Sequence, residues 1–139
     1  MVNSLIISKI SFKMSTQKEL GTTAFKAKDF ATAAEHFGKA IEEDPRDHAL
    51  FSNRSACYHN LKQHEEALGD AEMCINLKSD WGKGHQRKAM ALHGMGHLDE
   101  AYKAYQEGLK VDPDNSQIKS GMQAVMKDQQ ADAMRGGGF

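Results

Sequence analysis

"HALFSNRSACYHNLKQHEEALGDAEMCINLKSDW", residues 48–81, is the central member of a threefold repeat. Residues 14–47 and 82–115 align with it over the same 34 positions without a gap. A fixed period of this length is the sequence signature of stacked, repeated helical units. Small residues recur in register: Ala33, Ala67 and Ala101 at the twentieth position of each unit, and Ala40, Cys74 and Gly108 at the twenty-seventh.

Each unit predicts two helices joined by a short turn. Pro45 and Pro113 follow the second helix of their units, where proline ends a helix. The recurring small residues allow the paired helices to approach closely, and each pair leaves an apolar side that the next pair covers. We therefore predict an all-α fold, a right-handed α-solenoid of three helix pairs. The expected first helices are 14–27, 48–61 and 82–95, and the second helices are 30–44, 64–78 and 98–112.

Residues 116–134 predict a seventh helix that caps the last repeat. Ile118, Met122, Val125 and Met126 recur at helical spacing. This apolar stripe covers the open face of a terminal repeat, although a methionine pair can also serve as a partner-binding stripe. The predicted repeat domain is 14–134, and the glycine-rich residues 135–139 are expected to form a flexible tail or the start of a linker.

The first thirteen residues stand apart from the repeats. Residues 1–13 contain a short apolar segment that is too small to span a bilayer and lacks the features of a secretory signal. We expect a disordered leader or an alternative start before Met14. A targeting segment is the alternative interpretation.

Overall composition narrows the function classes. A net charge of −1 argues against nucleic-acid or membrane binding by the chain as a whole. Cys57 and Cys74 lack the spacing of a redox or metal motif. They predict buried, reduced thiols and a cytoplasmic protein.

Sorting the charges by helix reveals a segregation that the net charge hides. The second helices hold twelve acids against four lysines, whereas the first helices hold six basic residues against one acid, Glu19. In stacked helix pairs the first helices line the concave surface. A basic concave surface focuses its field on an anionic ligand. The six basic residues are Lys18, Lys26, Arg54, Lys83, Arg87 and Lys88.

The groove-facing residues can be selected from the helical period. The core is expected to take positions four, seven, eight and eleven of each first helix, which leaves positions two, five, six, nine and twelve for ligand. Lys88 falls at a core-type position and is expected to extend outward. The selected residues are Lys18, Thr22 and Phe25 in the first unit, Asn53, Ala56 and His59 in the second, and Lys83, Arg87 and Met90 in the third.

The repeat resembles a known family. Its length, its helix–turn–helix pattern and the residues Leu20, Gly21, Ala33, Phe37, Ala40 and Pro45 resemble the tetratricopeptide repeat. The stretches "LFSNRSACY" (50–58) and "DWGKGHQRKAMAL" (80–92) resemble its carboxylate-clamp class, and most closely the first repeat domain of the stress-inducible, Hsp-organising co-chaperones. The resemblance implies binding of the C-terminal Glu-Glu-Val-Asp tail of 70- and 90-kDa heat-shock chaperones, with the 70-kDa class favoured.

The resemblance also implies roles for individual residues. Lys18, Asn53, Lys83 and Arg87 match the clamp. Lys18 and Asn53 would receive the main-chain carboxylate, and the other two would receive the side-chain carboxylate or the carbonyls before it. Thr22 stands where the family has asparagine, so we expect binding weaker by about 1 kcal/mol, the usual worth of one hydrogen bond. Phe25 and Ala56, with His59 and Met90 beside them, are the predicted pocket for a peptide side chain.

Other chemistries find little support. His93 and His97 are four residues apart, but His97 falls in a predicted turn and no cysteine lies beside them, so no metal is expected. "GKG" and "GMG" lack phosphate-loop spacing, and no nucleophile–base pair is evident, so we expect no cofactor, no small-molecule substrate and no enzyme activity. Two alternatives remain: the targeting module of a larger enzyme, such as a phosphatase, prolyl isomerase or ubiquitin ligase, or a general interaction scaffold.

Overall fold

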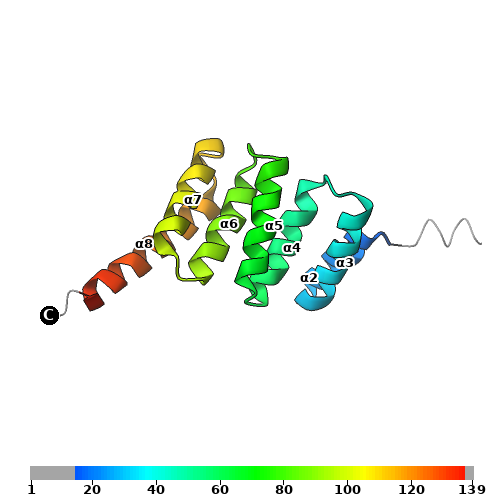
Figure 1. Ribbon diagram of the computed structural model, residues 1–139, viewed down its shortest axis with the longest axis horizontal. Coiled ribbons are helices and arrows are strands. Elements are labelled where there is room, and N and C mark those ends of the chain that lie inside the picture. The colour runs from blue at the N-terminus through cyan, green and yellow to red at the C-terminus, as the bar shows by residue number, and fades with distance from the viewer. Residues whose placement is uncertain (1–14, 137–139) are drawn as a thin grey trace, which may run out of the picture.

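The computed structural model describes residues 15–136, which form seven consecutive helices and no strand within that range. Figure 1 shows the helices stacked side by side along the long axis of the molecule, with α8 leaving the stack at one end. The all-α repeat fold predicted from the sequence is confirmed. The helices are α2 (Gln17–Lys26), α3 (Phe30–Glu43), α4 (His48–Asn60), α5 (His64–Leu77), α6 (Gly82–Gly94), α7 (Leu98–Val111) and α8 (Ser116–Gly136).

The turn inside each pair has the same backbone geometry in all three units. Lys28, Lys62 and Gly96 occupy the same position of the repeat and adopt positive φ values of 62°, 61° and 80°. The residue after each of them donates its backbone N–H to a carbonyl five positions earlier, as Gln63 does to Tyr58 at 2.8 Å. This left-handed residue reverses the chain after the first helix.

The recurring small residues lie where the helices of a pair meet. The alanines and Cys74 among them are buried, and Gly108 is buried as well. Gly21 shows how close the approach is, because a Cβ atom placed on it would lie 2.8 Å from the ring of Phe37 on α3. The closely packed first pair therefore depends on the absence of a side chain at Gly21.

The seventh helix caps the stack with its first half. Ile118 and Val125 are fully buried in a cluster with Leu92 and Tyr105. Beyond Val125 the helix carries no further buried residue in its described part, and Met134 is 76% exposed. α8 continues through Gly136, two residues past its predicted end at 134.

Contacts between repeats place the first helices on one side of the stack. α4 contacts α6, and α6 contacts α8, in addition to the contacts of each helix with its neighbours in sequence. Cys57 and Cys74 are free and buried as predicted, and burial raises the pKa of both thiols to about 11. None of the described helices combines the length and apolar character that a bilayer-crossing segment requires. The predicted leader, 1–13, and residues 137–139 lie outside the described residues.

Candidate peptide-binding groove

Six of the nine residues selected from the sequence line a single cavity of about 240 Å³. Its walls come from the first helices α2, α4 and α6, and Phe37 of α3 is its seventh lining residue. We call this cavity the clamp pocket. The six selected residues in it are Thr22, Phe25, Asn53, Ala56, Lys83 and Arg87.

Arg87 brings an uncompensated positive charge into the clamp pocket. Its Nε donates to the hydroxyl of Ser52 at 3.3 Å, and its Nη1 lies 3.9 Å from the sulfur of Met90. No carboxylate of the described residues forms an ion pair with it. Burial lowers the pKa of the guanidinium from its usual value, which means that the cation lacks full solvation. A partly buried cation of this kind is stabilised by an incoming anion.

Lys83 supplies the second charge on the same helix. Its Nζ lies 5.7 Å from the centre of the Trp81 ring, within cation–π range. Trp81 in turn packs edge-to-face against His48, with ring centres 4.8 Å apart. The ammonium group therefore has an aromatic neighbour and no acidic partner among the described residues. Lys83 and Arg87 together form the α6 corner of the clamp pocket.

The opposite corner, formed by α2 and α4, is less available for an anion. Lys18 is absent from the lining of the clamp pocket, and its Nζ lies 3.5 Å from Oδ2 of Asp47. The hydroxyl of Thr22 donates to the backbone carbonyl of Lys18 at 2.9 Å. The proton of this hydroxyl therefore already has an acceptor one helical turn away on the same helix.

The predicted side-chain pocket is divided in two. Phe25 and Ala56 line the clamp pocket, whereas His59 and Met90 line a neighbouring cavity of about 350 Å³ together with His93. The ring centres of His59 and His64 are 5.4 Å apart. Burial, followed by the neighbouring His64, lowers the pKa of His59.

One residue of the predicted basic surface has a structural role. Arg54 donates from Nε and Nη2 to both carboxylate oxygens of Asp70 on α5, at 2.7 and 2.8 Å. The Asp70 hydrogen bond raises the pKa of the guanidinium. Including Arg54 among the cations of the concave surface was wrong, because the second helix supplies a buried acid that neutralises it.

Sequence reasoning missed two residues that contact the groove residues. Ser52 accepts the hydrogen bond of Arg87, and it lies at a predicted groove position although it is fully buried. Asp47 pairs with Lys18, and its position just before the predicted second-unit helix marks it as an N-cap but not as a partner of α2. Of the two histidines considered for a metal, His93 pairs with Asp128 at 2.6 Å, and no group of three potential ligands forms within residues 15–136.

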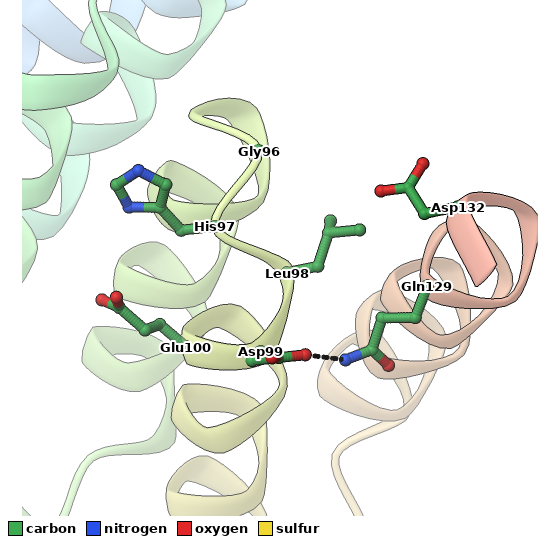
Figure 2. Close-up of a pocket in the computed structure, with 7 residues that line it drawn as sticks. All are labelled: Gly96, His97, Leu98, Asp99, Glu100, Gln129 and Asp132. Atoms are coloured by element: carbon green, nitrogen blue, oxygen red, sulfur yellow. Dashed lines mark hydrogen bonds between the residues drawn. The ribbon is translucent and has the colours of Figure 1, made fainter. Parts of the chain in front are cut away.

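A larger cleft lies at the far end of the molecule. Figure 2 shows it between the start of α7 and the end of α8, where Gln129 donates to Asp99 at 2.8 Å. Asp99, Glu100 and Asp132 are the charged side chains around it, so the cleft is acidic. The charges of this cleft would repel an acidic ligand, whereas those of the clamp pocket would attract it.

Stacked helix pairs with a groove along their first helices define a helical repeat domain. Profiles of the tetratricopeptide repeat match residues 18–72 and 82–115, and the chain belongs to this family.

Similar proteins confirm the predicted resemblance to the Hsp-organising co-chaperones. The heat shock protein sti1 homolog of Schizosaccharomyces pombe is 49% identical over 122 residues, which is 88% of this chain and 21% of that protein. The Hsp70-Hsp90 organising protein of Plasmodium falciparum (isolate 3D7) is 43% identical over 108 residues, 78% of this chain and 19% of that protein. The chain thus spans about a fifth of the length of these relatives.

A solved structure extends the comparison to a complex. The first tetratricopeptide repeat domain of Spaghetti (RPAP3), bound to the HSP90 peptide SRMEEVD, superposes with a TM-score of 0.77 at 25% identity. The match covers 82% of this chain and 90% of that chain. The two domains therefore share the helical repeat fold over most of their length.

Proposed function

We propose that the chain is a co-chaperone peptide-binding module that grips the acidic C-terminal tail of heat-shock chaperones of the 70- and 90-kDa classes. The ligand is an extended peptide ending in Glu-Glu-Val-Asp, and the 70-kDa class is favoured. The module acts as a cytoplasmic adaptor without catalysis of its own. The names of the relatives and the peptide bound to the neighbouring structure support this proposal.

The observation that carries the proposal is the pair of unneutralised cations at the α6 corner. Lys83 and Arg87 face the same cavity as the Asn53 amide and have no acidic partner among the described residues. A terminal aspartate carries two carboxylates, one on the main chain and one on the side chain. The fork of Arg87 and the point charge of Lys83 suit the side-chain carboxylate, whereas the Asn53 amide, with Lys18, suits the main-chain carboxylate.

The apolar part of the clamp pocket suits the residue before the terminal aspartate. Phe25, Phe37 and Ala56 offer apolar surface in the same cavity. Valine at this position would bury its two methyl groups there, which is a modest gain. Few contacts and an extended ligand give an affinity of about micromolar Kd that falls with added salt.

The experiment is calorimetric titration of the protein with a peptide ending in Glu-Glu-Val-Asp, as the free acid and as the C-terminal amide. The wild type should bind the free acid and should bind the amide more weakly. Lys83→Met should lose most of the affinity for the free acid. Lys103→Met is the matched control, because it removes the same charge from an exposed position on α7.

The outcomes are distinct. Loss of binding with Lys83→Met and retention with Lys103→Met supports the groove as the site. Equal affinities for the free acid and the amide, or equal losses in the two lysine variants, would contradict the clamp and leave only nonspecific charge attraction.

A further inference from the structure

Lys18 is the groove cation that already has an anion beside it. Its Nζ lies 3.5 Å from Asp47 Oδ2, whereas Lys83 and Arg87 form no ion pair with any described residue. Asp47 therefore cancels the charge of Lys18 at the α2–α4 corner, whereas the α6 corner keeps two positive charges.

The backbone holds the Asp47 carboxylate in place. Asp47 is the N-cap of α4, and its Oδ1 accepts the backbone N–H of Ala49 at 3.0 Å. This leaves Oδ2 free to face Lys18 from the neighbouring helix. The Asp47 side chain is 24% exposed, against 53% for Lys18. Because the cap already fixes the acid, forming this ion pair restricts only the lysine.

The ion pair lies where the ligand's terminal carboxylate is expected. Lys18 precedes Thr22 by one helical turn, and Thr22 lines the clamp pocket. Asp47 begins the helix that carries Asn53 into the same pocket. A carboxylate held between Lys18 and Asn53 thus comes near the Asp47 charge, and like charges repel.

We propose that Asp47 is an internal competitor of the ligand in the groove. It acts as a built-in carboxylate that competes with the ligand's C-terminal carboxylate for Lys18 and so weakens binding at the α2–α4 corner. This inference rests on the proposed function. It assigns the main anchoring of an acidic tail to the α6 corner. At the other corner, the ligand must displace Asp47 before it can pair with Lys18.

Asp47→Asn tests the competition with little change in structure. Asparagine caps a helix about as well as aspartate, so α4 keeps its start while the charge disappears. In calorimetric titration with the free-acid Glu-Glu-Val-Asp peptide, we expect a Kd about two- to fivefold lower than for the wild type, the range of one exposed ion pair. Asp47→Ser, which also retains a cap, should show a gain of the same sign. The thermal unfolding midpoints should stay close to that of the wild type.

Two further arms identify the mechanism. In a Lys18→Met background, Asp47→Asn should give a clearly smaller gain, since no lysine remains for the two carboxylates to share. With the amidated peptide the gain should also shrink, because the competing main-chain carboxylate is absent. A gain of equal size in all arms would mean that Asp47 acts only through the general electrostatic field of the groove, and it would contradict competition for Lys18.

The failure of this inference and of the proposed function can be told apart. Wild-type binding with an unchanged or higher Kd for Asp47→Asn, in a protein that unfolds normally, overturns the inference alone. Absence of binding by the wild type and by Asp47→Asn overturns the proposed function and the inference together.

Discussion

The two corners of the groove are both built on first helices of the repeat but differ in how their charges are satisfied. At the α6 corner, Arg87 contacts only neutral groups, and Lys83 contacts an aromatic ring. At the α2–α4 corner, Lys18 pairs with Asp47, and the Thr22 hydroxyl bonds to its own helix. A cation that has no acidic partner in the free protein gains more from an incoming anion than a cation that is already paired. The α6 corner is therefore expected to dominate the affinity.

The largest expected effect comes from removing the least solvated cation. Arg87→Met should weaken binding of the Glu-Glu-Val-Asp peptide by about 2–5 kcal/mol, the cost of truncating one partner of a buried charged contact. The free energy of unfolding should not fall much, because no acid among residues 15–136 pairs with this group. Titration calorimetry and urea unfolding measure the two quantities.

Arg54→Met serves as the matched control for that substitution. It removes the same charge from the preceding first helix but leaves the nearly buried Asp70 carboxylate unpaired. The free energy of unfolding should fall by about 3 kcal/mol, as in other broken buried pairs, while the folded protein still binds peptide. If Arg54→Met abolished binding in a folded protein, the separation of structural and groove arginines would be wrong.

A gain is expected from strengthening the weaker corner. Thr22→Asn places an amide where the threonine hydroxyl now bonds to the Lys18 carbonyl. One additional hydrogen bond to the peptide carboxylate should improve the binding free energy by about 1 kcal/mol. Thr23→Asn is the control, because it makes the same change at the next position of α2. Equal gains from both variants would indicate a helix effect and not a groove effect.

Lys18→Met should cost less affinity than the α6 variants. The lysine gives up Asp47 when it binds the ligand, so its net contribution should be about 0.5 kcal/mol, as for an exposed ion pair. The measurement is the ratio of the Kd values of Lys18→Met and Lys83→Met for the same peptide. A loss equal to that of Lys83→Met would show that the two corners contribute equally to the affinity and would contradict the dominance of the α6 corner.

The smallest effect is a pH dependence of the free energy of unfolding that arises at His59, in the cavity next to the clamp pocket. Burial and the neighbouring His64 lower the pKa of His59, so the folded state disfavours its protonation. The unfolded chain then binds more protons between the ordinary histidine pKa of about 6.5 and the lowered value, and stability falls as the pH decreases through this window. Urea unfolding at a series of pH values should show the decrease, and His59→Gln should reduce it.

The periodicity of the sequence predicted the fold well because it reports which side of each helix is buried. Ala33, Ala67 and Ala101 recur at one position and are all fully buried between helices. The predicted first and second helices agree with the observed ones to within a few residues, and Pro45 follows α3 as expected. The predicted end of α8 at 134 falls two residues short, because Arg135 and Gly136 continue the helix while exposed and so leave no apolar pattern.

The same periodicity predicted which residues lie near the groove but not their partners. Positions on one helix face are set by the period, and Asn53, Lys83 and Arg87, which share that face, line one cavity. Whether a cation is free depends on acids contributed by other helices, such as Asp70 for Arg54 and Asp47 for Lys18. These pairs join residues that are 16 and 29 positions apart, and nothing in the repeat pattern relates them.

Gly21 has a consequence for the shape of the groove although it does not line it. The ring of Phe37 lies against Gly21 on one side and lines the clamp pocket as well. A single methyl group on that glycine would displace the ring or push α2 away from its partner helix. The shape of a binding site on the concave surface thus depends, in part, on a side chain that is missing from the helix behind it.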